Sequence, residues 1–432
     1  MFAHYLQGRM GPKTPTFSRQ TIFTVVVFFT LLIWSWQIFG SSTPRTRESS
    51  KPSAPIVDPL PPYVKPRYWS ASHLGGLEGI KAFPKPDGLN KIVAIIFYGR
   101  PATVSILDCY LKRNLIKNGG MLDEVVWIVR TNDTSHKAYL DVLLAEEDAY
   151  TKWNVTFGEN EDYRSAYDRV QNGTMYIKID DDIVFMEDTV IPSIVDSKWK
   201  NPDYFIISAN IMNQPSLSWV HWRLGAVRPY LPEIEPAPPS DVVPEELRVE
   251  WKASALPDWT SSDPEWIMSL EYISPYKKHR WLPVKYDTSN RSIDDTPIIF
   301  TDFNAFSEGL WKWTIAAQQH YSFFENLEKN ELWRYKFSEW NYNYTRMGIQ
   351  FVAMMGEDIN MGKPIVERDD EYYFSEVMTQ KTSRHGVVDG RSLVAHYSFK
   401  PQRDGIASTD ILDRYRTFAD ENICIQPVRP IY

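Results

Sequence analysis

The sequence predicts an α/β fold, a mixed and mostly parallel sheet flanked by helices, placed behind an N-terminal transmembrane helix and an extended stem. Two observations support this: short apolar runs alternate with helical stretches from residue 91 to 179, and residues 22–39 contain no charge. Parallel strands need helical crossovers, so the alternation favours a parallel sheet covered on both faces. With 432 residues, of which 43% are hydrophobic, the chain can bury a large core.

The predicted elements follow one another regularly in the first half of the globular part. Strands are expected at residues 91–98, 125–129, 153–157, 175–179 and 205–209, and helices at 102–118, 135–150 and 162–171. Gly119 and Gly120 end the first helix, and Asp133 and Thr134 are cap candidates for the second. In such a sheet, ligands bind at the carboxyl ends of the strands. Beyond residue 210 the periodicity weakens, and an α+β half with a proline-rich insertion is expected.

The N-terminal region predicts where in the cell the protein is located. Residues 22–39 cover roughly 27 Å as a helix, enough for a thin bilayer, and Arg9, Lys13 and Arg19 before them favour a cytoplasmic N-terminus. A cleaved signal peptide is the alternative. The predicted segments are a tail (1–20), a signal anchor (21–40), a Pro/Ser-rich stem (41–87) and a globular domain (88–432) with halves 88–210 and 211–432. Five N-glycosylation sequons support a luminal domain; they begin at Asn132, Asn154, Asn172, Asn290 and Asn343.

Charge and cysteine content narrow the function classes. Lys and Arg number 47 against 55 Asp and Glu, a net charge of −8, so a nucleic-acid-coating role is not expected. The two cysteines, Cys109 and Cys424, exclude a zinc ribbon and permit at most one disulfide.

The most informative motif is the acidic triplet Asp180, Asp181 and Asp182, which ends an apolar strand and precedes another apolar run. Burying three like charges without a cation is costly, because desolvation and mutual repulsion add. A hard divalent ion such as Mn²⁺ or Mg²⁺ removes that cost and usually also holds a phosphate. The alternative is an exposed acidic turn after an edge strand.

The Asp-x-Asp spacing, set in an alternating α/β half behind a signal anchor and a stem, resembles the metal-dependent Golgi glycosyltransferases of the GT-A fold. The resemblance implies that Asp180 faces the ribose of a nucleotide sugar and that Asp182 binds the metal bridging its diphosphate. The triplet leaves the register ambiguous, and Asp181 can replace either.

Further motifs extend the resemblance over residues 90–400. Glu357 and Asp358 resemble the acidic pair that the family places near the acceptor, where Asp358 would be the general base; the alternative is that Asp358 only caps a helix. His396 resembles the histidine that completes the metal shell of the family; the alternative is a buried histidine of the core. The resemblance places three residues near the nucleotide: Tyr98, Arg100 and Arg164.

The expectation is therefore a glycosyltransferase that uses Mn²⁺ or Mg²⁺ to move a sugar from a nucleotide-sugar donor to a glycan, glycoprotein or glycolipid acceptor. It is expected in the Golgi membrane, single-pass type II, with a luminal catalytic domain and an inverting course if Asp358 reaches the acceptor hydroxyl. Two rivals remain open. One is a haloacid-dehalogenase-like phosphatase, which shares the Asp-x-Asp pattern, and the other is a membrane-tethered, Ca²⁺-binding lectin or adhesion ectodomain.

Overall fold

The computed structural model describes residues 82–155, 163–234, 249–260, 277–367 and 369–424. The predicted membrane helix at 22–39 and most of the predicted stem lie outside these ranges. Within them, none of the helices combines the length and the apolar character that crossing a bilayer requires.

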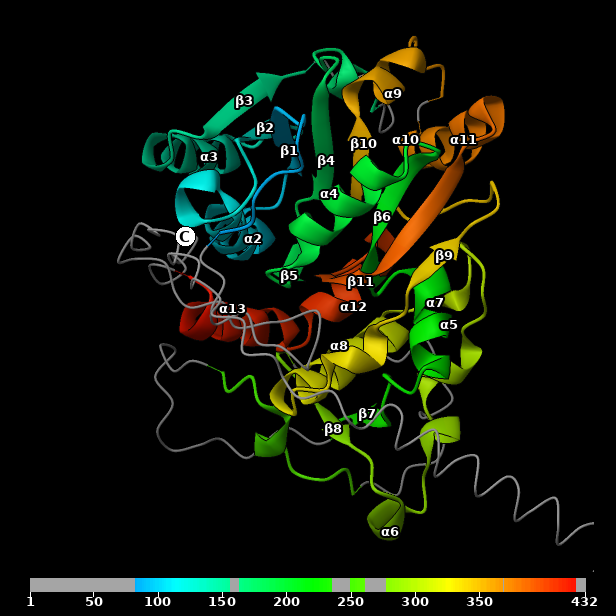
Figure 1. Cartoon of the computed structure of the whole chain (residues 1–432). Helices are drawn as coiled ribbons and strands as arrows, with labels where there is room; N and C mark the ends of the chain where they lie inside the picture. Colours follow the sequence, from blue (N-terminus) through cyan, green and yellow to red (C-terminus); the bar gives the residue numbers. More distant parts are fainter. Residues whose placement is uncertain (1–81, 156–162, 235–248, 261–276, 368, 425–432) are drawn as a thin grey trace, which may run out of the picture. The chain divides into compact units, whose positions relative to one another are not determined.

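A single large sheet carries the fold (Figure 1), with strand order β3-β2-β1-β4-β10-β6-β11-β5. Its first four strands are parallel: β1 (Lys91–Tyr98), β2 (Glu124–Val129), β3 (Tyr150–Asn154) and β4 (Thr174–Asp180). Strands β1, β2 and β4 match the predicted ones closely, whereas β3 lies three residues earlier than the predicted strand at 153–157. Seven of the eight β1 residues are buried, as expected for a strand covered on both faces.

The helices between these strands follow the predicted pattern with one exception. Helix α2 (Pro101–Asn114) continues into a short 3₁₀ turn, η1 (Ile116–Asn118), and α3 (Thr134–Glu146) is capped by the Asp133 side chain, as the sequence predicts. The helix predicted at 162–171 is only a 3₁₀ turn, η2 (Arg164–Tyr167). Tyr163 and Tyr167 pack on Phe97 there, so tertiary contacts override local propensity.

The second half of the chain completes the same sheet. Strand β10 (Phe351–Met355) lies between β4 and β6 (Tyr204–Met212) and is antiparallel to both. Strand β11 (His385–His396) is parallel to β6 and antiparallel to β5 (Ile183–Met186) and to β9 (Glu339–Asn341). The sheet is therefore parallel in one half and mixed in the other, and the predicted division at residue 210 does not separate two sheets.

Helices and short segments pack around this sheet. Helix α4 (Val190–Lys200) crosses β6, β10 and β11 (Figure 1). The other long helices are α5 (Pro215–Arg223), α8 (Trp313–Glu328) and α13 (Ile411–Asn422). Shorter helices are α6 (Tyr286–Ser289), α7 (Glu308–Trp311), α9 (Gly356–Met361), α10 (Asp370–Tyr372), the π-helical η8 (Tyr373–Val377), α11 (Met378–Thr382) and α12 (Arg403–Ala407). The 3₁₀ turns are η3 (Ala253–Ala255), η5 (Ile293–Asp295), η6 (Pro297–Phe300), η7 (Leu332–Tyr335) and η9 (Lys400–Gln402).

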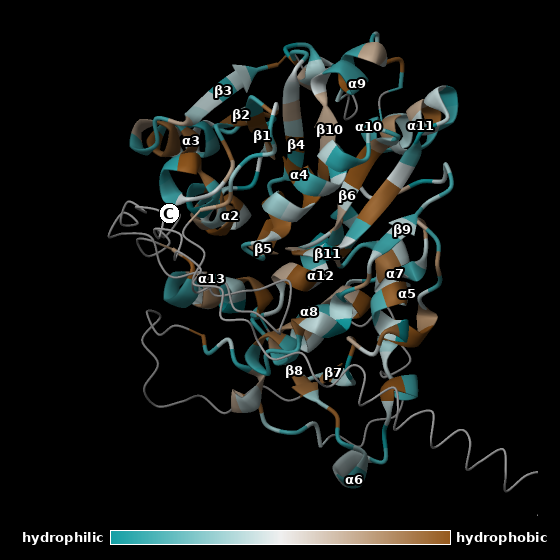
Figure 2. Cartoon of the chain, viewed as in Figure 1, coloured by the Kyte–Doolittle hydropathy of each residue, from teal (hydrophilic) through white to brown (hydrophobic). Residues whose placement is uncertain are grey.

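The proline-rich insertion begins with an ordered element. Strand β7 (Tyr230–Pro232) pairs with β8 (Trp281–Pro283) as a separate two-stranded sheet. The buried Trp259 donates its indole N–H to the carbonyl of Pro232. Figure 2 shows that hydrophobic residues concentrate on the strands of the large sheet, including β5, β6 and β11. Three of the described tryptophans are almost fully buried and belong to the core: Trp127, Trp259 and Trp281.

Cys109 on α2 and Cys424 after α13 form a disulfide that closes a separation of 315 residues. Replacing both with serine is expected to lower the free energy of unfolding by about 2–5 kcal/mol, because the bond restricts the unfolded chain. Urea unfolding of the oxidised protein and of the double variant measures the difference. A reductant should shift the midpoint of the wild type toward that of the variant and leave the variant unchanged; equal midpoints for the two oxidised proteins would contradict the expectation.

Candidate functional site

The acidic triplet lies at the carboxyl end of β4, the edge where the sequence predicts a ligand. Asp180 is the last residue of β4, and β5 begins at Ile183, so Asp181 and Asp182 form the turn between the two strands. Asp180 is partly exposed, whereas Asp181 and Asp182 are buried. The alternative of an exposed acidic turn is therefore wrong for two of the three carboxylates.

Asp181 is engaged by the turn that follows β1. Its Oδ2 accepts hydrogen bonds from the backbone N–H groups of Gly99 and Arg100, both at 2.7 Å, and its Oδ1 accepts from Nε of Arg100 at 2.8 Å. These bonds tie the end of β4 to the start of α2. Asp181 therefore fixes the position of Arg100. Both carboxylate oxygens of Asp181 are already engaged in these hydrogen bonds.

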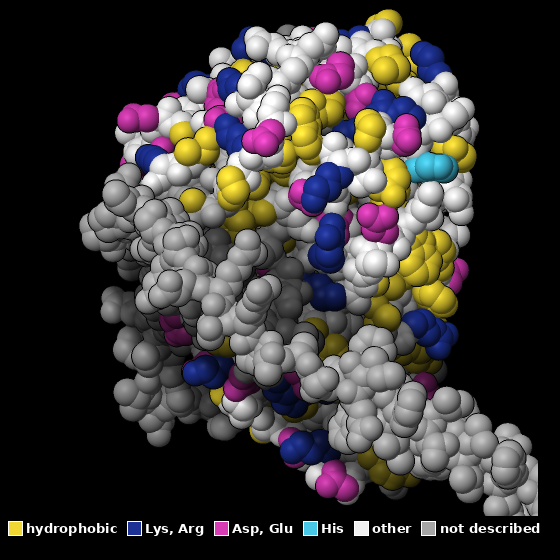
Figure 3. All heavy atoms as spheres, viewed as in Figure 1, with side chains coloured by type: hydrophobic (Ala, Val, Ile, Leu, Met, Phe, Trp, Pro, Cys, Tyr) yellow, Lys and Arg dark blue, Asp and Glu magenta, His cyan; other side chains and the backbone are white. Residues whose placement is uncertain are grey.

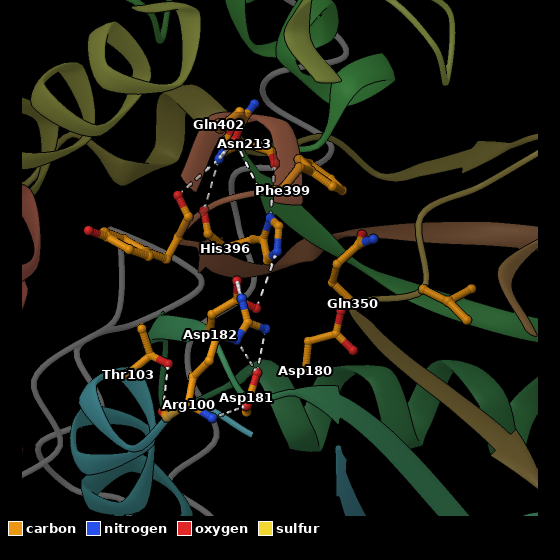
Figure 4. Close-up of polar contacts among 12 residues, drawn as sticks. Arg100, Thr103, Asp180, Asp181, Asp182, Asn213, Gln350, His396, Phe399 and Gln402 are labelled. Carbon is orange, nitrogen blue, oxygen red and sulfur yellow. Dashed lines mark hydrogen bonds and ion pairs between the residues drawn. The ribbon is translucent and has the colours of Figure 1, made fainter. Parts of the chain in front are cut away.

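Asp182 faces two cationic groups. Arg100 Nη1 donates to its Oδ2 at 2.5 Å, and Nε2 of His396 lies 3.3 Å from its Oδ1 (Figure 4). Burial opposes ionisation, but Arg100 and His396 together hold the pKa of the Asp182 carboxyl well below its usual value. Asp182 is therefore a carboxylate at neutral pH.

His396 reaches this turn through strand pairing. It lies at the end of β11 and pairs with Ile183 of β5, one residue after Asp182, where the register shifts. Its Nδ1 lies 3.3 Å from the carbonyl oxygen of Asn213. Burial opposes a charge on the imidazole, but Asp182 raises the pKa of His396, so Nε2 carries a proton toward Asp182. A metal ion bound there would displace that proton, while Nδ1 keeps its contact with the carbonyl.

The segment around His396 is held by an amide network (Figure 4). Asn213, which is fully buried, donates through Nδ2 to the carbonyl oxygens of His396 and Tyr397 and to Oε1 of Gln402, at 3.0–3.3 Å. The same Gln402 oxygen accepts from the backbone N–H of Phe399 at 3.0 Å. These bonds fix the orientation of the imidazole.

Asp180, Asp182 and His396 form a group that can hold a metal ion, since one ligand atom from each lies within 4.8 Å of the others. Oδ1 of Asp182 is buried and contacts Nε2 of His396 at 3.3 Å without a hydrogen bond of regular geometry, so a cation would bind an oxygen that is weakly engaged. The residues fit a divalent cation with mixed carboxylate and imidazole ligands.

A cavity of about 420 Å³ opens beside Asp180. Lys178, also on β4, lines the cavity and donates to Asp180 Oδ1 at 2.5 Å and to the carbonyl of Ile349 at 3.0 Å. The backbone N–H of Asp180 donates to the carbonyl of Gln350, whose side chain also lines the cavity and keeps a buried Oε1 without a hydrogen-bond partner. The cavity therefore reaches one of the candidate metal ligands, Asp180, and is lined by a residue with an unpaired acceptor, Gln350.

Residues 369–371 form the acidic wall of this cavity. Glu371 accepts from Nε of Arg346 at 2.7 Å and from Nε2 of Gln350 at 3.1 Å, so both of its oxygens are engaged. Asp370 is buried, and its Oδ2 accepts from the hydroxyl of Tyr167 at 2.6 Å. Burial raises the pKa of Asp370 above its ordinary value, although Lys178 and the Tyr167 hydroxyl oppose the shift.

The structure does not bring Glu357 and Asp358 to the acidic triplet. Strand β10 runs antiparallel to β4, with Phe351 opposite Ile179 and Met355 opposite Met175. Residues after Met355 therefore lie at the amino end of β4, where Glu357 accepts a hydrogen bond from the N–H of Gly173 at 3.1 Å. The length of β4 separates them from Asp180 by roughly 20 Å. A catalytic role for this pair at the metal site does not fit that separation.

Asp358 instead belongs to a buried ion cluster. It pairs with Lys198 at 2.9 Å and with Arg384 at 2.5 Å. Asp358→Asn is expected to lower the free energy of unfolding by about 3 kcal/mol, because it leaves buried cations without a counter-charge, and to leave turnover per folded molecule unchanged. Denaturant unfolding and an activity assay normalised to folded protein measure the two effects. Glu357→Gln, at an exposed position, is the control; loss of turnover with unchanged stability would restore the catalytic assignment.

The three residues assigned to the nucleotide differ in placement. Arg100 contacts Asp181 and Asp182 and keeps part of its side chain exposed at the site. Tyr98 is fully buried and donates its hydroxyl to the carbonyl of His136 at 2.6 Å, so it faces the core. Arg164 is exposed and does not line the cavity. Tyr163, which does line it, stacks under the guanidinium of Arg130 at 3.7 Å.

Several site residues carry no strong signal in the sequence. Lys178 is the exception, since a lysine two residues before the first aspartate shares its face of the strand. The acidic run 369–371 is typical of a solvated loop. Three further site residues are isolated amides, and their role in the site depends on the groups with which they form hydrogen bonds: Asn213, Gln350 and Gln402.

The fold and the site together define an α/β protein with a buried carboxylate–imidazole group at the carboxyl end of a parallel strand. No family model matches the chain, and no curated protein sequence does. A structure described as GalNAc-T7 with UDP, GalNAc and Mn²⁺ aligns at a TM-score of 0.36 and 11% identity. The alignment covers 77% of this chain and 48% of that one, so the chain spans about half the length of that protein. A likeness of this size carries no weight, and the functional conclusion rests on the geometry above.

Proposed function

We propose that this chain is a metal-dependent glycosyltransferase of the GT-A kind, which transfers a sugar from a nucleotide-sugar donor to a glycan, glycoprotein or glycolipid acceptor. The observation that carries the proposal is the group Asp180, Asp182 and His396, gathered where β4 ends, with Asp180 lining the 420 Å³ cavity. A cavity of that size accommodates a small-molecule ligand.

The proposed cofactor is Mn²⁺ or Mg²⁺, held by Asp182 and His396 with Asp180 beside it; the imidazole nitrogen favours Mn²⁺, since Mg²⁺ prefers oxygen ligands. Such a cation stabilises the negative charge that develops on the departing diphosphate. Arg100 adds a fixed positive charge at the same end of the site. Asn213 keeps the imidazole of His396 oriented, as described above.

Asp370 is the proposed general base in place of Asp358. It lines the cavity that Asp180 lines, and the Tyr167 hydroxyl and the charge of Lys178 face it. Both oxygens of Glu371 are bonded, so Glu371 positions Gln350 and Arg346 instead. A raised pKa suits Asp370 to accepting a proton from an acceptor hydroxyl. Direct attack by that hydroxyl implies an inverting course.

The proposed location is the Golgi membrane, with residues 21–40 as a type II signal anchor, 41–87 as the stem and the catalytic domain in the lumen. The Cys109–Cys424 disulfide supports an oxidising compartment.

Calorimetric titration of the full-length chain in detergent with UDP and GDP, with and without Mn²⁺, tests the proposal. We expect binding of a nucleoside diphosphate that requires the metal, followed by metal-dependent hydrolysis of one nucleotide sugar in a screen. Hydrolysis of a simple phosphate ester without nucleotide binding would favour the phosphatase. Binding of Ca²⁺ and glycans without any nucleotide would favour the lectin.

A further inference from the structure

A second hollow, of about 460 Å³, lies on the surface near β9. Its lining combines the aromatic rings of Phe303, Trp340 and Tyr342 with the polar side chains of Glu339, Asn341 and Asn343. Figure 3 shows hydrophobic side chains gathered on the surface in the region of β9 and α7. Phe303 is 40% exposed, although most phenylalanine rings among the described residues are buried. A contiguous group of aromatic side chains rimmed by polar residues is typical of a binding surface.

The aromatic rings are held in place by ordered elements. Trp340 lies on β9 and pairs with Val388 of β11, so the large sheet supports it. The Phe303 ring packs against Trp340 at 5.1 Å and against Tyr342 at 6.0 Å between centroids. It also meets Trp219 of α5, with 6.0 Å between the ring centroids. The surface is therefore preformed, which lowers the entropic cost of binding.

This hollow adjoins the cavity beside Asp180 along two chain segments. Phe303 lines the hollow, and Phe306, in the same loop, lines the cavity. Thr345 lines the hollow, and the next residue, Arg346, lines the cavity. Arg346 also lies over the ring of Phe306, 5.2 Å from its centroid, so the two segments meet at the rim. An extended ligand can pass from one space to the other over this rim.

The chemistry of the lining selects a neutral carbohydrate. The C–H faces of sugar rings stack on aromatic side chains, and their hydroxyls bond to carboxylates and amides. Among the described residues that line the hollow there is no lysine or arginine, so nothing there would neutralise a phosphate or a sulfate. A nucleotide or a polyanion therefore does not fit.

We infer that this hollow, centred on Trp340 and Phe303, is a second sugar-binding subsite, which holds the part of a neutral oligosaccharide acceptor that lies away from the reacting hydroxyl. The inference rests on the proposed function, which places the reacting end in the cavity beside Asp180. It deepens that proposal, because it makes the acceptor a chain of several neutral sugars, longer than a single sugar or a bare hydroxyl amino acid.

Binding of neutral oligosaccharides to the full-length chain tests the inference. The probes are manno-, gluco-, galacto- and chito-oligosaccharides of two to six units, with each monosaccharide as reference, measured by calorimetry without nucleotide. We expect at least one series to bind more tightly as its length increases. Trp340→Ala should weaken that binding by about tenfold, the loss expected when one stacking ring is removed. Phe303→Ala, at a more exposed ring, should act in the same direction.

The control is Tyr286→Ala, because Tyr286 is an aromatic residue on α6 that is 70% exposed and lines neither space. It should bind the oligosaccharide as the wild type does. Binding of nucleoside diphosphate and Mn²⁺ should be equal in all variants, which reports their folding and tests the proposed function separately.

Three results would overturn the inference. One is that none of the oligosaccharides binds while nucleotide and metal do. Another is that an oligosaccharide binds equally to the wild type, Trp340→Ala and Phe303→Ala. The third is a glycan on Asn343, found by mass spectrometry, because Asn343 begins a sequon and its own glycan would then occupy the hollow.

Discussion

Asp182→Asn is expected to reduce sugar transfer by about 1000-fold or more, because it removes the charged ligand that faces His396 and with it the cation that stabilises the leaving diphosphate. The amide keeps the shape of the side chain, and Arg100 keeps Asp181 as its partner. The loss of stability should therefore be about 1–3 kcal/mol, smaller than for a fully broken buried pair. Calorimetry with Mn²⁺ and denaturant unfolding measure the two effects.

The matched control for this change is Asp196→Asn. Asp196 pairs with Lys200 on an exposed face of α4, so its replacement should change neither activity nor metal binding. Chelation of the wild type with EDTA should reproduce the loss of activity, and added Mn²⁺ should restore the wild type but not Asp182→Asn. A variant that keeps its turnover would remove the metal assignment.

Asp370→Asn is expected to lower kcat by about 10²–10⁴-fold and to leave the KM for the donor unchanged, the effect of losing a general base. In the wild type, kcat should fall as the pH drops through the raised pKa of Asp370, because the protonated acid cannot accept a proton. Asp180, Lys178 and Tyr167 are the charged or titratable groups that bear most on this pKa. The variant should lose that acidic limb of the profile. Steady-state kinetics over a pH series measure both effects.

Asp369→Asn provides the control. The Asp369 side chain caps α10 by accepting the N–H of Tyr372 at 3.1 Å and pairs with Arg346, so its loss should affect the stability of the segment. The acidic limb should remain, moved to lower pH, because the Asp369 charge contributes to the raised pKa of Asp370. If Asp370→Asn retains the wild-type kcat and the acidic limb, the base must be another group.

The parallel half of the fold could be predicted because its signals are local. The apolar run at 91–98 is buried at nearly every position, and helix α3 begins at the cap that Asp133 supplies. The functional role of the acidic triplet was also predictable. Burying carboxylates at the end of an apolar strand costs free energy, so their presence there indicates a function. His396 came within reach of Asp182 as expected, although only the pairing of β11 with β5 explains why.

The misplacement of Asp358 has a physical cause. Its motif follows an apolar strand, and the sequence pattern of an apolar strand is the same whether the strand runs parallel or antiparallel to its neighbours. The direction of β10 is set by its pairing with β4 and β6, contacts that lie about 140–180 residues away in the chain. Likewise, Asp370 in the acidic run at 369–371 gains its role only from burial beside Lys178, which no local pattern encodes.

The position of β5 at the end of the strand order bears on how this protein matures. Among the described residues its only strand partner in the large sheet is β11, some 200 residues later, so the turn that carries Asp182 lacks its histidine until β11 has been synthesised. Contacts of such long range are formed late and slowly. A ribosome-bound intermediate that ends before β11 should therefore have an incomplete sheet and no affinity for manganese. The disulfide to Cys424 would form only after β11 has paired with β5.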